Sequence, residues 1–293
     1  QAIATIPHDP ARRFLTGHSM GGHGTWHLGV TYPDRFAAIG PSAGWVSFFS
    51  YGGAPAGGED PVAGMLRRAA GTSDTLALAT NLAPLGVYAL HGDADDNVPV
   101  TEARAMVERL RPFHQGVTLF EQKGAGHWWD LSDEPGADCV DWPPMFDAFA
   151  RRRRPALAEV REVDFVTMNP GVSATSAWAT IEAQERPLLP SRVRLRCDPA
   201  KRRFVGTLEN VLALSLDVSS LAPGAPIEVR VEGAFQATVP WPSGAPRITF
   251  DRLRGGWEAV DGLGAGRKTP ARAGPFKDAF RHGFQLVYGT RGT

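Results

Sequence analysis

The chain has 293 residues, with 31 basic and 31 acidic side chains and a hydrophobic content of 43%. This neutral balance gives no reason to expect a nucleic-acid partner or binding to an anionic membrane surface. No apolar run approaches the ~20 residues that a membrane-spanning helix requires. The length predicts two domains with packed cores. The two cysteines, Cys139 and Cys197, support neither a disulfide framework nor a metal site.

The first informative elements are a strand, a sharp turn and a helix. Residues 12–16 are predicted to form a short buried strand, and residues 20–30 a helix. Between them, the run 17–21 reads Gly-His-Ser-Met-Gly and matches the nucleophile elbow, in which a serine occupies a strained strand-to-helix turn. Small residues flank the serine because the backbones crowd there. A glycine-rich turn around a buried serine is the alternative, but the flanking elements favour Ser19 as a nucleophile.

Two later strands lead to candidate partners for this serine. A serine hydroxyl needs a histidine to take its proton, and the histidine needs a carboxylate to hold its tautomer. The predicted strand 85–90 runs into a turn that carries Asp93, Asp95 and Asp96. The predicted strand 117–120 runs into a glycine-rich loop that ends at His127. His127 is therefore the candidate base, and the turn offers three candidate acids.

The order Ser19, Asp95, His127, each just beyond a predicted strand, resembles the α/β-hydrolase superfamily, whose triads run Ser, Asp or Glu, His. The stretch from Thr16 to Trp26, the pattern His-Gly-x-x-Asp ending at Asp95, and Gly126-His127 resemble the prolyl oligopeptidase-like (peptidase S9-type) branch and related esterases. The resemblance covers about residues 1–155. It implies a catalytic triad in which Asp95 is the acid, and an oxyanion donor in the backbone N–H of Met20.

Aromatic and histidine side chains near these residues carry weaker expectations. Trp128 and Trp129 follow the candidate base, so they are candidates for a substrate-pocket wall, with simple packing as the alternative. His23 and His27 share one face of the predicted helix, but the His-Glu-x-x-His pattern of zinc enzymes is absent. We therefore expect packing roles for them, and neither a metal nor a cofactor.

The position of the elbow predicts that the chain is a fragment. In the superfamily, the second oxyanion donor comes from a loop upstream of the elbow, whereas only 18 residues precede Ser19. The chain starts with Gln1, and a strand-like run at 284–288 lies close to its end. A lost start would also hide a signal peptide, so a secreted or periplasmic location stays open beside a cytoplasmic one.

The second half changes from helical to alternating patterns. Residues 139–154 are predicted to form a closing helix, and its four final arginines, 151–154, are interpreted as complementing the helix dipole. Seven short strands are expected from residue 160 onward, which is typical of a β-sandwich; they lie at 164–168, 178–182, 192–196, 203–207, 213–218, 227–231 and 247–250. The expected fold is α/β: an incomplete α/β-hydrolase with a mostly parallel sheet and flanking helices in residues 1–155. An all-β, sandwich-like domain follows in 156–293, with a further element starting after 274.

Three functions remain open from the sequence. The first is a serine hydrolase that cleaves peptide or carboxylic ester bonds through an acyl-enzyme on Ser19. The second is a catalytically silent fragment or pseudoenzyme without a complete oxyanion hole. The third is a binding module, in which the β-domain recognises carbohydrate or protein through exposed Trp178, Trp241 or Trp257.

Overall fold

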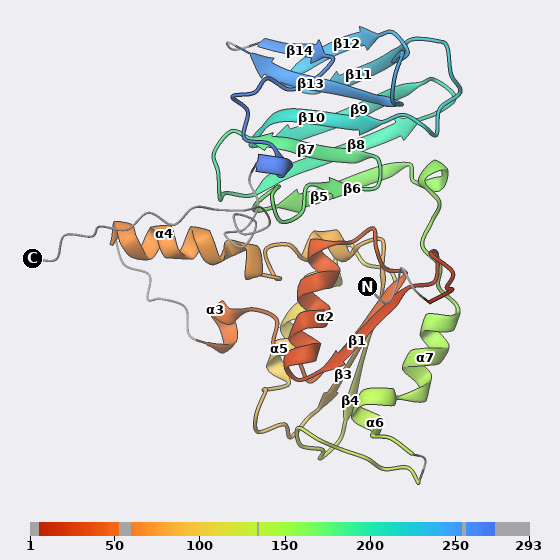
Figure 1. Cartoon of the computed structure of the whole chain (residues 1–293). Coiled ribbons are helices and arrows are strands. Elements are labelled where there is room, and N and C mark those ends of the chain that lie inside the picture. Colours follow the sequence, from red (N-terminus) through yellow and green to blue (C-terminus); the bar gives the residue numbers. More distant parts are fainter. Residues whose placement is uncertain (1–5, 53–59, 134, 254–255, 273–293) are drawn as a thin grey trace, which may run out of the picture.

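The computed structural model describes residues 6–52, 60–133, 135–253 and 256–272. The predicted strand at 284–288 and the further element expected after residue 274 lie outside the described residues. Two layered bodies stand one above the other in Figure 1. We call residues 14–150 the α/β part and residues 162–260 the β-sandwich.

The α/β part is built on a sheet of four parallel strands. Their bounds are β1 Phe14–His18, β2 Ala38–Ser42, β3 Gly86–Gly92 and β4 Val117–Gln122, and their spatial order follows the chain. The parallel pairings of β1 with β2, β2 with β3 and β3 with β4 confirm the mostly parallel sheet expected from the sequence. Because parallel strands end at one edge, the loops that follow β1, β3 and β4 meet there.

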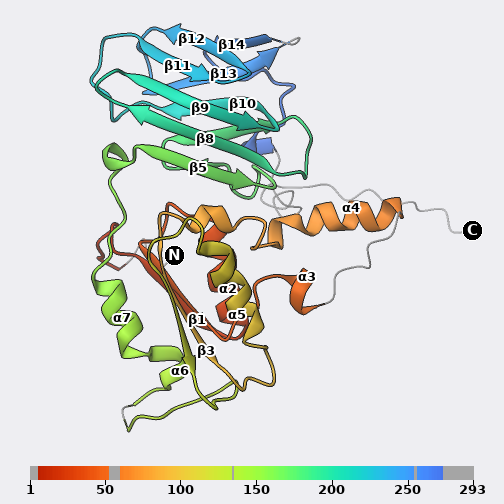
Figure 2. The same cartoon turned by 180° about the vertical axis from the view of Figure 1, so that it is seen from behind.

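Helices cover both faces of this sheet (Figures 1 and 2). Alternate strand residues serve the two faces: Ile39 packs with α2 and α5, whereas its neighbour Ala38 packs with Met145 and Phe149 of α7. The predicted closing helix at 139–154 is wrong as one element, since two short helices meet at Trp142, where Pro143 and Pro144 follow. The α-helices are α2 Met20–Thr31, α3 Phe48–Tyr51, α4 Pro61–Ala70, α5 Thr101–Leu110, α6 Asp138–Asp141 and α7 Pro143–Ala150. Within the described ranges, none of them has the length and apolar character of a membrane span.

The β-sandwich consists of two five-stranded sheets. One has the order β12-β11-β9-β8-β5 and the other β14-β13-β10-β7-β6. Every pairing is antiparallel except that of β9 with β11. The strands are β5 Glu162–Thr167, β6 Thr175–Ser176, β7 Ala179–Gln184, β8 Ser191–Asp198, β9 Arg203–Glu209, β10 Val211–Asp217, β11 Ile227–Val231, β12 Phe235–Val239, β13 Arg247–Leu253 and β14 Gly256–Val260. The sequence located seven of these strands and missed the short β6 and the hairpin partners β12 and β14.

The tryptophans of the β-sandwich serve its core. Trp178 is only 1% exposed and packs edge-on against Phe204, so the expectation of an exposed Trp178 was wrong. Trp257 stacks on Phe235 with ring centroids 5.0 Å apart, and Trp241 lies against the same core under the guanidinium of Arg202. Burial of large aromatic surface explains all three positions.

The α/β part and the β-sandwich are joined by buried hydrogen bonds. Asn81, 1% exposed, donates to the carbonyl oxygens of Val30 and Val166, and its own carbonyl oxygen accepts the Val166 N–H. Asp34 accepts the N–H of Ala177 from the sandwich. Val166 itself packs into the core beneath α2. One asparagine therefore satisfies backbone groups of both bodies at once.

Replacing Asn81 with alanine should lower the free energy of unfolding by about 2–4 kcal/mol, because buried backbone groups on both sides of the interface lose their partners. Urea denaturation followed by circular dichroism measures this loss. Thr118→Ala, at an exposed position of β4, is the control and should change stability by less than about 0.5 kcal/mol. Equal stability of the two variants would contradict the bridging role of Asn81.

Candidate active site

Ser19 occupies a strained turn between β1 and α2. Its backbone angles are φ 59° and ψ −117°, a conformation that residues other than glycine rarely adopt. The turn is held by a 2.9 Å hydrogen bond from the Ser19 N–H to the Ser42 carbonyl at the end of β2, and by one from the His23 N–H to Ser19 O. Ser19 therefore stands at the carboxyl edge of the sheet and at the N-terminus of a helix.

Glycines permit the close approach that this turn requires. A Cβ atom on Gly17 would lie 2.5 Å from the carbonyl oxygen of Gly21. A Cβ atom on Gly22 would lie 2.2 Å from Ser42 O, and one on Gly44 would lie 2.3 Å from the backbone of Gly22. Since real Cβ atoms do not approach other atoms so closely, the first turn of α2 can lie against the loop after β2 only with glycine at these positions.

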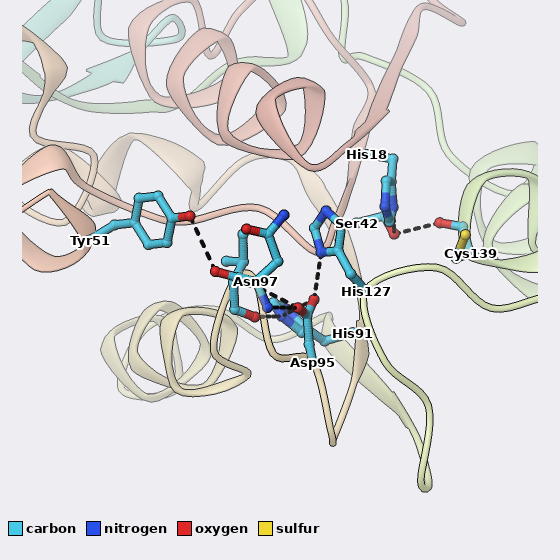
Figure 3. Close-up of polar contacts among 9 residues, drawn as sticks. His18, Ser42, Tyr51, His91, Asp95, Asn97, His127 and Cys139 are labelled. Atoms are coloured by element: carbon cyan, nitrogen blue, oxygen red, sulfur yellow. Dashed lines mark hydrogen bonds and ion pairs between the residues drawn. The ribbon is translucent and has the colours of Figure 1, made fainter.

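His127 and Asp95 are joined by a hydrogen bond of 2.8 Å from His127 Nδ1 to Asp95 Oδ2 (Figure 3). The Asp95 side chain is fully buried, and its Oδ1 accepts the N–H groups of Asn97 and Val98 at 2.9 and 2.8 Å. Burial by itself would raise the pKa of Asp95, but the hydrogen bonds from His127 and the two backbone groups outweigh it and lower the pKa. Asp95 is thus an anchored anion beneath His127.

The neighbouring Asp93 and Asp96 are exposed elsewhere in the same turn. Asp93 is exposed and accepts the Gly124 N–H at 2.5 Å, which ties its turn to the loop that carries His127. Asp96 is exposed at the tip of the same turn. Of the three acids that the residues alone left open, Asp95 is the one in contact with His127.

His91 supports Asp95 from below. Its Nε2 donates to the Val98 carbonyl at 2.8 Å and lies 3.4 Å from Asp95 Oδ2. Burial lowers the pKa of His91, so the ring stays neutral. The place of His91 in the His-Gly-x-x-Asp pattern was the signal in the sequence for this contact.

His18, the residue before Ser19, lies against the candidate base His127. The rings of His18 and His127 have centroids 4.8 Å apart, so the loop after β4 reaches the loop after β1. Among the described contacts no hydrogen bond joins the Ser19 hydroxyl to His127. The fold thus places the strained Ser19 at the same sheet edge as His127 and the buried carboxylate of Asp95 that contacts it.

A polar chain fixes the His18 ring, and sequence reasoning missed it. Ser42 Oγ donates to the carbonyl oxygen of Cys139, so it accepts the hydrogen bond of 3.1 Å from His18 Nδ1 (Figure 3). Burial, followed by the nearby His127, lowers the pKa of His18 to about 4. His18 is therefore neutral, with its proton on Nδ1, and adds no positive charge beside His127.

Trp128 and Trp129, which follow His127, lie in different surroundings. Trp128 is 65% exposed and lies over the His18 ring, with centroids 4.1 Å apart. Trp129 is 7% exposed and packs against Phe120 and Trp142 in the core. Only Trp128 borders the surface beside the elbow, and Trp129 has the packing role that the sequence left as its alternative.

A second group of aromatic rings borders the same edge. Trp45 is sandwiched between His23 and Tyr51, with centroids 4.7 and 4.9 Å away and nearly parallel rings. The Tyr51 hydroxyl donates to the Asn97 carbonyl in the turn that carries Asp95 (Figure 3). His23 therefore packs, as expected, and within the described residues no group of three His, Cys, Asp or Glu side chains is placed to hold a metal ion.

The first residue of α2 is Met20, whose N–H has no partner one turn earlier in the helix. The N-terminus of a helix carries partial positive charge and free N–H groups, which favour an anion at this position. Met20 is 73% exposed.

Substituting Gly22 with alanine should destabilise the protein by about 2–3 kcal/mol, because the new Cβ overlaps the Ser42 carbonyl and forces backbone to move. Gly24→Ala in the same helix is the matched control. Its Cβ meets nothing within 4 Å, so the helix should gain up to about 1 kcal/mol. Thermal unfolding of the two variants measures the difference, and a stable Gly22→Ala protein would contradict the crowding argument.

The free energy of unfolding should fall by at least about 1 kcal/mol between pH 7 and pH 5.5. Burial lowers the pKa values of His23, His91 and His114, so the unfolded chain binds protons more readily, and stability present above about pH 6.5 is lost as the pH falls. His114 holds both ring nitrogens in hydrogen bonds, to Leu85 O and from the Gly116 N–H.

The His114→Gln variant should therefore show a weaker pH dependence in urea titrations, whereas His8→Gln, at an exposed position, should keep the dependence of the unmodified chain. Stability that stays constant or rises on acidification would contradict the neutral state of the buried histidines.

Comparison with known proteins places the sequence similarity in the α/β part. Residues 3–132 match the family described as "Putative esterase". A protein of Arthroderma benhamiae described as an "Uncharacterized secreted protein" is 34% identical over 119 residues, which are 39% of this chain and 13% of that protein. The chain thus spans only a small fraction of the length of that relative.

Solved structures with partial similarity include hydrolases of several kinds. The acylaminoacyl peptidase of Pyrococcus horikoshii has a TM-score of 0.39 and 20% identity, over 50% of this chain and 25% of that chain. The S-formylglutathione hydrolase of Agrobacterium tumefaciens has a TM-score of 0.34 and 23% identity, over 43% and 46%. Residues 14–150 form a parallel sheet with helices on both faces, and residues 3–132 resemble the family described as "Putative esterase".

Proposed function

We propose that this protein is a serine hydrolase that cleaves carboxylic esters through an acyl-enzyme on Ser19. The observation that carries the proposal is the strained backbone of Ser19 at the N-terminus of α2, at the same sheet edge as the hydrogen-bonded pair of His127 and Asp95. A non-glycine residue with this φ value is held there by its surroundings, and such strain concentrates at reactive sites.

The tautomer of His127 suits a general base. Its Nδ1 donates to Asp95, so Nε2 is left unprotonated and can accept the proton of a serine hydroxyl. The buried, ionised Asp95 also stabilises the imidazolium that forms when the proton is taken. His18 beside it is neutral, so no second positive charge repels this imidazolium.

The reaction would proceed in two balanced halves. Ser19 Oγ attacks the ester carbonyl carbon while His127 takes the hydroxyl proton, and the oxyanion forms near the Met20 N–H and the start of α2. Collapse breaks the bond to the alcohol oxygen, which receives the proton from His127, and the acyl group stays on Ser19. Water then attacks the acyl-enzyme by the same route and releases the carboxylic acid.

Esters are favoured over peptides by the family similarity. The family that residues 3–132 match is described as "Putative esterase". Trp128 on one side of the elbow offers an exposed apolar surface to the substrate. The alcohol and acyl groups that the enzyme prefers would be set by this surface and by the loops around it.

A fluorophosphonate probe and p-nitrophenyl acyl esters test the proposal on the full chain. The unmodified protein should be labelled and should release nitrophenol, whereas Ser19→Ala should lose both activities. Ser219→Ala, at an exposed position of the β-sandwich, is the matched control and should behave like the unmodified protein. Asp95→Asn should reduce turnover about 10⁴-fold, because the amide no longer favours the productive tautomer.

Absence of label on the unmodified, folded protein would overturn the hydrolase proposal in favour of a catalytically silent relative. Equal labelling of Ser19→Ala would place the nucleophile elsewhere. Cleavage of an acylated peptide amide at a higher kcat/KM than its ester counterpart would overturn the ester preference alone.

A further inference from the structure

A cavity of about 580 Å³ lies between the α/β part and the β-sandwich. Phe36 and Pro84 line it, and they precede β2 and β3, so the cavity adjoins the amino edge of the parallel sheet. Ser19 and His127 follow strands at the carboxyl edge. Five-residue strands span roughly 16 Å, which makes the cavity separate from the candidate active site.

The walls of this cavity are mostly apolar. Phe36 and Phe113 come from the α/β part, Leu157 and Val160 from the connecting segment, and Val163 from β5 of the sandwich. The volume falls within the range of about 300–1,000 Å³ that is typical of small-molecule sites. Such a space would accommodate the hydrocarbon or aromatic body of a small ligand.

Three arginines and three acids also line the cavity, but their partners differ. Arg192 donates twice to Asp164, at 2.7 and 2.8 Å, and Arg194 donates to the same carboxylate at 3.2 Å. Two guanidinium groups therefore share one acid. Glu162 pairs at 3.2 Å with Arg196, which does not line the cavity.

Arg154 belongs to the arginine run that was interpreted as complementing a helix dipole. The helix ends at Ala150, four residues earlier, so that interpretation does not cover Arg154. Arg153 pairs with Glu159, whereas the Arg154 side chain turns inward and donates from Nη1 to the Asp34 carbonyl oxygen at 2.9 Å. This is its single side-chain hydrogen bond within the described part of the chain, and its Nε is buried without a partner there.

The third acid is bound elsewhere. The carboxylate of Asp34 accepts the Ala177 N–H, and burial raises the pKa of Asp34. Within the described contacts no carboxylate of the cavity accepts a hydrogen bond from Arg154, so its guanidinium keeps unused N–H groups. Guanidinium groups with unused donors recognise planar anions through charge-assisted hydrogen bonds.

We propose that this cavity binds a small amphipathic carboxylate, whose apolar body contacts Phe36 and Phe113 and whose carboxylate is bound by Arg154 and Arg194. A monoanion fits better than a phosphate dianion, because Asp34 and Asp164 lie in the same walls. The site is independent of the proposed hydrolase activity, since it shares no residue with the Ser19 edge.

Isothermal titration of the full chain with the straight-chain carboxylates from hexanoate to dodecanoate tests the proposal. At least one should bind with a Kd below about 1 mM. The primary amide of the same chain length, which lacks the charge, should bind at least about 10-fold more weakly. Arg154→Gln should weaken carboxylate binding by a similar factor, whereas Arg151→Gln, in the same run but outside the cavity, should not.

Three further variants keep the result decisive. If Arg154→Gln proves unstable in urea titrations, Arg194→Gln replaces it. Arg194 is half-exposed, and this substitution should also weaken binding. Ala83→Trp, which fills the cavity from its rim, should abolish binding, whereas Trp128→Ala at the opposite sheet edge should leave it unchanged.

Absence of binding by every carboxylate, equal binding of acid and amide, or undiminished binding to Ala83→Trp would each overturn the proposal. Loss of binding in Trp128→Ala but not in Ala83→Trp would place the carboxylate at the candidate active site instead. Esterase assays do not enter this experiment, so failure of the hydrolase proposal and failure of this one are distinguishable.

Discussion

The close approach of α2 to the loop after β2 is the constraint on which the candidate site depends. It exists because Gly22 and Gly44 have no side chains, so the helix backbone can lie against the Ser42 carbonyl. The hydrogen bond from Ser19 N–H to that carbonyl then holds the serine in a conformation that a free chain would avoid. A sheet edge and a helix N-terminus thereby come together at one residue.

The polar groups around this point are organised in two buried chains. One runs from His127 through Asp95 to the backbone of the turn after β3, with His91 beneath it. The other runs from His18 through Ser42 to the Cys139 carbonyl in α6. The first keeps a negative charge under His127, and the second fixes the orientation of the His18 ring, which burial keeps neutral. Together they hold two adjacent imidazole rings in place, as preorganisation for proton transfer would require.

The β-sandwich is more than an appended body, since its first strand contributes to the core of the α/β part. Val166 packs beneath α2, and Asn81 bonds both sides of the junction. Hydrogen bonds and apolar contacts thus join the two bodies, and a cavity with arginines in its wall lies beside them, since Asn81, Asp34 and Ala177 also line it. The same junction that stabilises the chain therefore creates a second place where a ligand would fit.

The sequence alone predicted the elbow and the strands that precede Ser19, the aspartate turn and His127, because these depend on local patterns: apolar runs, glycine spacing and residues just beyond strand ends. The resemblance to the α/β-hydrolase superfamily implied the parallel sheet and the choice of Asp95. The sequence also predicted the alternation of the sandwich strands, yet it missed β12 and β14, two five-residue strands of which the first has one buried residue and the second has none. The prediction of a single helix at 139–154 is wrong, because the chain forms two helices, α6 and α7, and Pro143 and Pro144 begin the second.

The residues alone left three candidate acids within four positions, and the resemblance implied Asp95. The tertiary structure shows that the turn buries Asp95 against His127. It also decided that Trp178 and Trp129 are buried while Trp128 is exposed, because burial depends on which surfaces meet and not on residue type. The Ser42 contact to His18 joins residues 24 positions apart, and the arginine-lined cavity joins residues as distant as Pro33 and Arg194. No local pattern carries that information, because such contacts arise only when segments far apart in the chain pack together.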